Sequence, residues 1–440
     1  MDIEYIHFYV DDAIAWRQWF VERWGFSAAG GWRDRQSCHE RVHSGAVRFL
    51  LSSALGTTGP VAAYLARHPQ GVVDVALRLS DLEALEATVA RAIALGAKLC
   101  QPITPLDRDP ADRDLAAKHS VNRHPARSGH WAAISGWGDL RHSLIQVDPA
   151  IPIDSPRQHS ADSSANWPPQ FQWPDPRQRP DLQRPDLQRP NLQRIDHCVL
   201  NVAAGDLPRT VDWYGQLFGL SPQQSFHIKT AHSGLHSQVL VGEPPGPDPS
   251  HRLQLPINQP ASPSSQIQEF LDHNRGPGIQ HIALLTPNLL PTVAQLRAQG
   301  ICFLSVPPSY YTQLRQRPKF QHQGLAQDWQ HICEQQALVD WHPERDEGSL
   351  LQIFTETIFP EPTFFFELIE RRRLSQAALP SGALQSGFPQ SGFPQPDALQ
   401  TLPADRCAQG FGEGNFQALF EAMERAQLGR AQAAEGLERP

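Results

Sequence analysis

The sequence predicts an α+β protein of two similar halves, each built from repeated units of a strand, a helix and further strands. The first observation is the order of elements, because strand, amphipathic helix and several strands follow one another twice along the chain. The second is a pair of internal matches: WFVERWGF (19–26) with WYGQLFGL (213–220), and GVVDVALRL (71–79) with GIQHIALLT (278–286). Recurrence of this kind indicates a duplication.

Elements of the first half follow from the spacing of its apolar residues. A helix over about 12–24 has apolar and aromatic residues at helical spacing and is ended by Gly25, and a second amphipathic helix covers 82–99. Short apolar runs bounded by turn residues predict strands at 5–10, 46–52, 72–79, 130–135 and 142–148. Together these form a domain over residues 1–150.

A change of composition separates the two halves. Residues 151–193 are rich in Pro, Gln, Asp and Arg and contain the repeat QRPDL, QRPDL, QRPNL, which lacks the apolar content of a core. We interpret this stretch as a linker. A second low-complexity stretch, residues 374–409, contains the repeat QSGFPQSGFPQ and is interpreted as an insertion.

The second half, residues 194–373, repeats the order of the first. Helices are expected at 207–218, ended by Gly219, and at 266–274 and 288–300. Strands are expected at 194–202, 237–242, 251–257, 278–286, 349–357 and 363–371. A final helix over 410–430 follows the insertion.

Composition excludes several functional classes. With 440 residues, 40% of them hydrophobic, the chain has room for two or more domains. Its net charge of −8 and the absence of a large basic cluster give no reason to expect nucleic-acid binding. The N-terminus lacks the pattern of a signal peptide and no apolar run is long enough to span a bilayer, so we expect a cytoplasmic protein without membrane contact. Six cysteines without a CxxC pair suggest neither a disulfide framework nor a zinc site.

One acid stands inside an aromatic strand. Glu367 lies in FFFELIER, and an ionised carboxylate in an apolar strand needs a partner, because burial without compensation is very costly. Two other predicted strands offer histidines in similar apolar runs, His197 in RIDHCVLNV and His281 in GIQHIALLT. Two histidines and one carboxylate form the ligand set that holds non-haem Fe(II) and leaves positions open for a substrate and O2. The alternative for any single histidine is a hydrogen-bonded core residue.

The first half offers no equivalent set. Asp74 stands where the second half has His281, and the last strand of the first half has no glutamate at the corresponding place, although His7 lies in its first strand. The sequence therefore predicts one metal site, in the second half, and a role in packing or solubility for His7 and Asp74.

Long motifs of the second half resemble 4-hydroxyphenylpyruvate dioxygenases of the vicinal oxygen chelate superfamily. The motifs are, in order, RIDHCVLNV, GLHSQVL, LQLPINQP, SQIQEFLDHNRGPGIQHIAL, VPPSYY, SLLQIFTE, FFFELIER and GFGEGNFQALFEAME. The resemblance covers about residues 194–423 strongly and the first 150 residues weakly. It implies two domains of paired βαβββ modules that curl into open barrels, with a C-terminal helix acting as a lid.

The resemblance also implies the activity and its residues. Fe(II) held by His197, His281 and Glu367 would convert 4-hydroxyphenylpyruvate and O2 to homogentisate and CO2, through oxidative decarboxylation, ring hydroxylation and side-chain migration. A homo-oligomer, dimer or tetramer, would form. The substrate would be surrounded by polar and small residues and by aromatic walls: Ser237, Pro256, Asn258, Gln266, Gln280, Phe354, Phe365, Phe411, Asn415 and Phe416.

Two alternatives accompany this hypothesis. A 4-hydroxymandelate synthase uses the same substrate and iron site but hydroxylates the benzylic carbon, and Pro256, Asn258 and Phe354 follow the dioxygenase pattern instead. A non-catalytic binding protein of the same fold would sequester an aromatic ligand, but it would gain nothing from an iron site with open positions.

Overall fold

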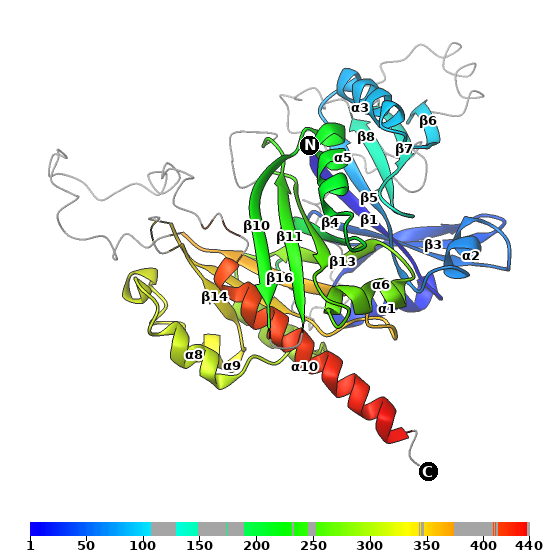
Figure 1. Ribbon diagram of the computed structural model, residues 1–440. Helices are drawn as coiled ribbons and strands as arrows, with labels where there is room; N and C mark the ends of the chain where they lie inside the picture. The colour runs from blue at the N-terminus through cyan, green and yellow to red at the C-terminus, as the bar shows by residue number, and fades with distance from the viewer. Residues whose placement is uncertain are drawn as a thin grey trace, which may run out of the picture.

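The computed structural model contains two eight-stranded sheets, one from each half of the chain (Figure 1). It describes residues 1–106, 129–147, 173, 189–230, 233–244, 252–342, 344, 347–373, 408, 410 and 412–437. The predicted insertion at 374–409 therefore lies outside the described residues, apart from Ala408. Within the described part of the chain, no helix combines the length and the apolar character needed to cross a membrane.

The first sheet has the strand order β2-β3-β4-β1-β5-β8-β7-β6. Its central pair, β1 and β5, is antiparallel, whereas β1 pairs with β4 and β5 with β8 in parallel. The elements are β1 (Asp2–Tyr9), α1 (Ala13–Arg23), β2 (Ser27–Arg33), β3 (Ser37–Ser44), β4 (Val47–Ala54), α2 (Pro60–Leu65), β5 (Gly71–Leu79), α3 (Leu82–Ala94), β6 (Leu99–Pro105), β7 (Gly129–Ser135) and β8 (Arg141–Val147).

The second sheet repeats this topology in the order β10-β11-β12-β9-β13-β16-β15-β14. Its strands are β9 (Arg194–Asn201), β10 (Ser221–Lys229), β11 (Gly234–Val241), β12 (Gln254–Pro260), β13 (Gly278–Leu285), β14 (Leu338–Asp340), β15 (Leu350–Phe354) and β16 (Phe365–Arg371). Its helices are α5 (Leu207–Phe218), α6 (Gln266–Asn274), α7 (Leu289–Ala298), α8 (Pro308–Leu314), the 3-10 turn η2 (Phe320–Gln323), α9 (Trp329–Glu334) and α10 (Glu413–Leu437). Each sheet therefore consists of two βαβββ modules, as the sequence predicted.

Equivalent glycines end the first helix of each half. Gly25 follows α1 and Gly219 follows α5, with φ of 66° and 67°, in the left-handed region that favours glycine. The internal match between residues 19–26 and 213–220 thus preserves a helix ending as well as a hydrophobic pattern. The strands β2 and β10 were not predicted, and both lie at sheet edges. Small residues, mostly Ala and Gly, make up β2, whereas β10 carries many exposed polar residues, so neither shows a clear apolar alternation.

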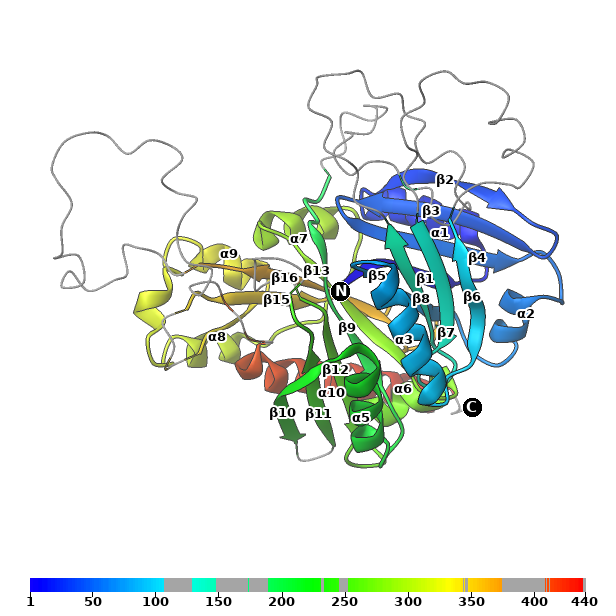
Figure 2. The ribbon, with the colours of Figure 1, turned by 90° about the horizontal axis from the view of Figure 1, so that it is seen from above.

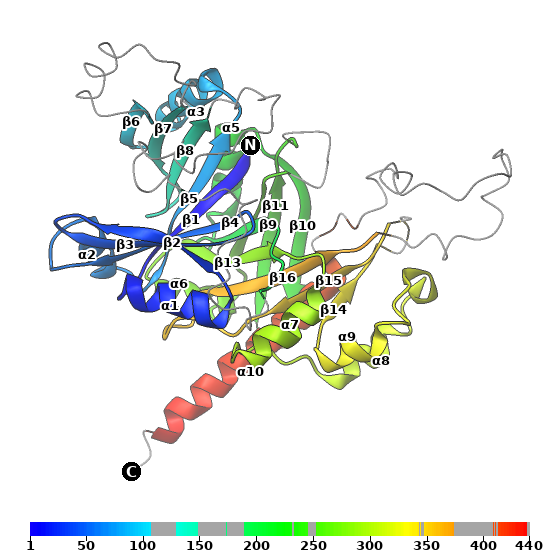
Figure 3. The same ribbon diagram turned by 180° about the vertical axis from the view of Figure 1, so that it is seen from behind.

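The two halves share one aromatic core, to which β16 contributes one of its faces. Phe364, just before β16, and Phe366 within it pack on Phe8 and Trp24 of the first half, with ring centroids 5.3 Å and 4.8 Å apart. From behind, β16 can be followed toward α1 of the first half (Figure 3). Because successive side chains of a strand point to opposite faces, Phe365 and Glu367 point the other way. One face of β16 therefore packs in the shared core, and the other face is available to carry site residues.

Two described residues of the stretch interpreted as a linker pack on the rest of the molecule, although the repeat was expected to lack core-forming residues. Leu192 is 2% exposed and belongs to the core cluster that spans both halves. Trp173 packs on Tyr5, with ring centroids 6.1 Å apart. Single apolar residues in a polar, proline-rich run have no periodicity, so the sequence pattern could not reveal that they dock.

We predict that Leu192→Ala lowers the free energy of unfolding by about 2–4 kcal/mol, because it leaves a cavity in a shared core. The matched control is Asn191→Ala, since Asn191 is exposed and should change stability by less than about 0.5 kcal/mol. Urea unfolding of both variants checks this. Equal stability of the two variants would show that the end of the linker does not dock.

Candidate metal centre

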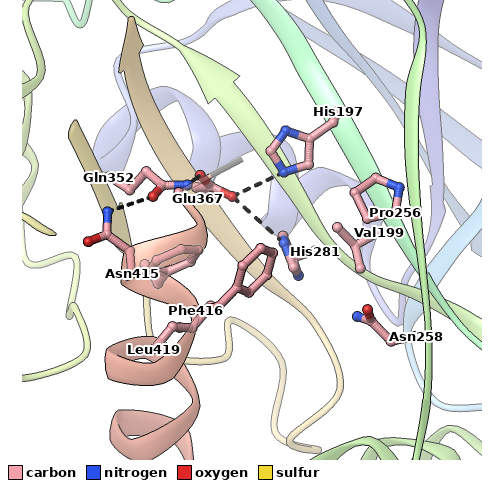
Figure 4. Close-up of a pocket in the computed structure, with 12 residues that line it drawn as sticks. His197, Val199, Pro256, Asn258, His281, Gln352, Glu367, Asn415, Phe416 and Leu419 are labelled. Atoms are coloured by element: carbon pink, nitrogen blue, oxygen red, sulfur yellow. Dashed lines mark hydrogen bonds and ion pairs between the residues drawn. The ribbon is translucent and has the colours of Figure 1, made fainter. Parts of the chain in front are cut away.

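Three strands of the second sheet bring the predicted ligands together. Ala283 on β13 pairs with His197 on β9 and also with Glu367 on β16. His281 precedes Ala283 by two residues on β13. His197, His281 and Glu367 converge, with exposed fractions of 3%, 6% and 1% (Figure 4). The ligand atoms of these side chains all lie within 4.8 Å of one another, and among the described residues no other group of three such side chains does so.

Distances in this group fit one small divalent cation. Glu367 Oε2 lies 3.2 Å from His197 Nε2 and 3.7 Å from His281 Nε2. Adjacent ligands around a metal with bonds of about 2.1 Å are about 3 Å apart, so only a small adjustment is needed. Among the described residues, no Lys or Arg forms an ion pair with Glu367. A buried carboxylate that faces only two imidazole nitrogens and an amide is best compensated by a bound cation.

The pKa values of the two histidines are shifted in opposite directions. Burial by itself lowers the pKa of His197, but the nearby Glu367 carboxylate and the hydrogen bond to Asp196 outweigh it and raise this pKa to about 9. Burial, followed by the neighbouring His197, holds the pKa of His281 well below its usual range. Without a metal, these shifts favour a protonated His197 beside the carboxylate and a neutral His281, and a bound cation would take the place of the His197 proton.

Each ligand has a further partner that fixes its orientation. His197 Nδ1 lies 3.0 Å from Asp196 Oδ2, and Asp196 forms a two-pronged ion pair with Arg371. Although burial alone would raise the pKa of Asp196, Arg371 and His197 hold it well below its usual range. The ring of Phe365 stacks on His281, with centroids 4.6 Å apart. Such partners typically set the orientation and basicity of a metal ligand.

The pocket in front of the ligands is closed by α10. Its cavity volume is about 20 Å³, room for about one water molecule. Helix α10 runs across β10 and β11 in Figure 1 and contacts β10, β14 and α6. Beside the ligands, the lining consists of Val199, Pro256, Asn258, Gln352, Phe354, Gly412, Asn415, Phe416 and Leu419.

Phe365 lines a second cavity of about 450 Å³. Its lining includes Gln266 and Gln280, and Arg430 of α10 also borders it, where it forms an ion pair with Glu269 of α6. Three more of the predicted residues thus line a neighbouring space rather than the closed pocket. A small aromatic acid has room beside the ligands only if side chains around the closed pocket move.

Several buried polar atoms near the pocket have no hydrogen-bond partner among the described residues. These atoms are Ser237 Oγ, Gln266 Oε1 and Asn201 Nδ2. Ser237 pairs with Asn258 across β11 and β12, and Asn258 donates a hydrogen bond to Asn201. Because buried polar groups are normally satisfied, this cluster favours a polar ligand that would complete its hydrogen bonds.

The structure describes most of the predicted site and adds residues to it. Phe411 lies outside the described residues. Gln352, Asp196 and Arg371 were missed. A signal existed for Gln352, because it precedes Phe354 by two residues in the strand LLQIF and so shares its face. For Asp196 and Arg371, only the tertiary contact between strands far apart in sequence reveals their pairing.

The first half holds its polar residues by internal pairing. Asp74 is fully buried, forms an ion pair with Arg141 and accepts hydrogen bonds from Ser143. His7 Nε2 lies 2.7 Å from Ser52 Oγ. The expectation of a role in solubility is therefore wrong for both residues, whereas a role in internal packing agrees with their burial.

Fold and site together define a class. A sheet of paired βαβββ modules around a buried His-His-Glu group is the arrangement of vicinal oxygen chelate proteins, and residues 194–319 match the family model described as "Glyoxalase/Bleomycin resistance protein/Dioxygenase superfamily". A solved triple mutant of 4-hydroxymandelate synthase from Streptomyces coelicolor shares the fold, with a TM-score of 0.66 and 23% identity over 97% of this chain and 98% of that chain.

Proteins that are similar to this chain over nearly its whole length identify the family within this class. The 4-hydroxyphenylpyruvate dioxygenase of Yarrowia lipolytica is 30% identical over 97% of this chain and 92% of that protein. That of Dictyostelium discoideum is 28% identical over 96% and 97%. An uncharacterized protein of Synechocystis sp. is 30% identical over 96% of this chain and 97% of that protein. The chain belongs to the 4-hydroxyphenylpyruvate dioxygenase family.

We predict that Glu367→Gln keeps the fold but lowers the affinity for a divalent metal by more than about 100-fold, because a neutral amide is a poorer ligand than a carboxylate. Isothermal titration with Co(II) under argon measures this. The matched control is Glu356→Gln, at an exposed acid just after β15. Wild-type metal affinity in Glu367→Gln would remove Glu367 from the site.

Proposed function

We propose that this protein is an Fe(II)-dependent dioxygenase that converts 4-hydroxyphenylpyruvate and O2 to homogentisate and CO2. The observation that carries the proposal is the buried group of His197, His281 and Glu367, found in a chain that aligns along nearly its full length with dioxygenases of this name. Three protein ligands leave three positions of an octahedral metal open, which accommodates a two-point chelating 2-oxo acid and O2.

The donor set fits iron. Two imidazoles and one carboxylate, with open positions on one side, are the ligands of non-haem Fe(II) oxygenases, and the O2-dependent reaction proposed here selects iron over zinc, which has no redox chemistry. When bound, Fe(II) would supply activation of O2, which is reduced while the chelated 2-oxo acid is oxidised and loses CO2. The residues of the chain would bind and orient the substrate.

The surrounding side chains suit the two ends of this substrate. Phe354 and Phe416 line the closed pocket beside the ligands and offer aromatic faces for a phenol ring. Ser237, Asn258 and Gln266 carry the polar atoms that a phenol hydroxyl or a carboxylate would satisfy. Because α10 closes the pocket, it would also exclude water during the reaction.

Product identification tests the proposal. The protein is loaded with Fe(II) under argon, 4-hydroxyphenylpyruvate and air are added, and the products are separated by chromatography. We expect homogentisate and one CO2 for each O2 consumed. 4-Hydroxymandelate as the main product would identify a synthase instead. Ligand binding without O2 uptake would identify a non-catalytic binding protein.

Phe354 is expected to help decide which carbon is hydroxylated. It is 5% exposed and its ring meets those of His281 and Phe365 edge-on, each with centroids 6.2 Å away. The ring carbon that bears the side chain and the benzylic carbon are one bond apart, so small changes in ring placement matter. A difference of about 1.4 kcal/mol between the two barriers changes the product ratio tenfold.

We predict that Phe354→Tyr diverts a measurable share of turnover to 4-hydroxymandelate while decarboxylation continues, because its hydroxyl disturbs the aromatic wall. The matched control is Phe320→Tyr, at a half-buried ring between Trp329 and Trp341 that does not line the pocket. Chromatography of both product mixtures provides the readout. A homogentisate fraction unchanged in Phe354→Tyr and in substitutions of Pro256 and Asn258 would show that this wall does not steer hydroxylation.

A further inference from the structure

A hydrogen-bonded chain links the ligand Glu367 to the first turn of α10. Gln352 Nε2 donates to Glu367 Oε1 at 2.8 Å, and Asn415 Nδ2 donates to Gln352 Oε1 at 2.8 Å. The hydroxyl of Tyr310 donates to Asn415 Oδ1 at 2.7 Å. Gln352 and Asn415 are 3% and 2% exposed. Figure 4 shows both amides in line with Glu367.

The direction of this chain is set at the Glu367 end. An ionised carboxylate only accepts hydrogen bonds, so Gln352 must present its amide nitrogen to Glu367 and its oxygen to Asn415. Asn415 must then donate to Gln352 and present its own oxygen to the Tyr310 hydroxyl. Reversing Gln352 would break its bonds on both sides, and reversing Asn415 would break its bond to Gln352, so each amide is held by its neighbours.

A second chain links the ligand His197 to the residues that precede α10. Asp196 accepts from His197 and is held by Arg371, whose Nη1 donates to the backbone oxygens of Gly410 and Ala408 at 2.8 Å and 3.2 Å. The side chains of Asp196 and Arg371 are 0% and 5% exposed. One guanidinium therefore orients a metal ligand and also binds the backbone segment that leads into α10.

A glycine allows the backbone before α10 to approach Gln352 closely. Gly412 has φ of 76°, and a Cβ there would lie 1.9 Å from Gln352 Oε1. Any other residue would be strained at this φ and would displace either the start of α10 or the amide of Gln352. The backbone before α10 thus fits directly against the side chain that orients Glu367.

We propose that docking of α10 and the orientation of the metal ligands are energetically coupled through these two chains, with Gln352, Asn415, Asp196 and Arg371 as positioning residues. Docking of α10 completes the hydrogen bonds that aim Glu367 and His197 at the metal. By linkage, metal binding stabilises docked α10 by the same free energy that docking adds to metal binding. The inference rests on the proposed metal centre but on no particular substrate or reaction.

Co(II) is the probe for the test, because its visible absorption reports ligand geometry without turnover. Hydrogen–deuterium exchange of peptides covering 412–430 is measured with and without Co(II), and the Co(II) affinity is measured by competition with a chelator. We expect Co(II) to slow exchange at the start of α10 in the unmodified protein. In Asn415→Leu the affinity should fall about 10-fold, the usual cost of losing an outer hydrogen-bond partner, the absorption should shift, and the slowing should disappear.

Two further variants make the result specific. Gln352→Met has a similar shape but cannot donate to Glu367, and it should reproduce the effects of Asn415→Leu. Glu424→Gln weakens another anchor of α10, the hydrogen bonds that Glu424 accepts from Thr230 and Ser233, without touching either chain. It should retain both the Co(II) absorption and the metal-dependent slowing of exchange.

The proposal fails if Asn415→Leu and Gln352→Met keep the affinity, the absorption and the metal-dependent exchange of the unmodified protein, because these contacts would then only hold a helix. It also fails if Co(II) binds the unmodified protein without slowing exchange in α10. Absence of Co(II) binding to the unmodified protein would overturn the metal centre itself, whereas an unexpected reaction product would leave the coupling intact.

Discussion

The buried carboxylate of Glu367 is the constraint on which the rest of the site depends. An ionised group that is 1% exposed is stable only with strong compensation, and here two histidine nitrogens and an amide surround it. The negative charge of Glu367 is compensated best when a divalent cation lies between the carboxylate and the two imidazole nitrogens. The geometry therefore makes sense as a metal centre rather than as an ion pair.

The strand that carries Glu367 also explains how two sheets support one site. Phe366 on the opposite face of β16 packs on Trp24 of the first half, so the ligand is anchored to a rigid aromatic core. Seen from above, the two sheets lie side by side and α10 passes along the second one (Figure 2). The first half keeps the same topology but uses Asp74 for an ion pair with Arg141, which leaves its own sheet without a ligand set among the described residues. The first of the two similar sheets thus packs against the second, and the second carries the ligand set.

Much of this was predictable from local patterns. The two-fold repeat, the ligand-bearing strands and the alternation in FFFELIER depend on short-range periodicity, which the chain displays plainly. Contacts between residues far apart in sequence were not predictable: Arg371 reaches Asp196, and Leu192 docks into a core from within a proline-rich stretch. Ser237 shows an intermediate case, since the family resemblance placed it at the substrate but the structure shows only a buried hydroxyl without a partner among the described residues.

The most direct measurement of the central claim is the position of the metal. Crystals of the protein loaded with Fe(II) under argon would be measured on both sides of the iron absorption edge. We expect a single anomalous peak within bonding distance of His197 Nε2, His281 Nε2 and the Glu367 carboxylate, and none in the first half. A peak at Asp74 and His7, or iron-loaded protein with no peak among the three proposed ligands, would contradict it.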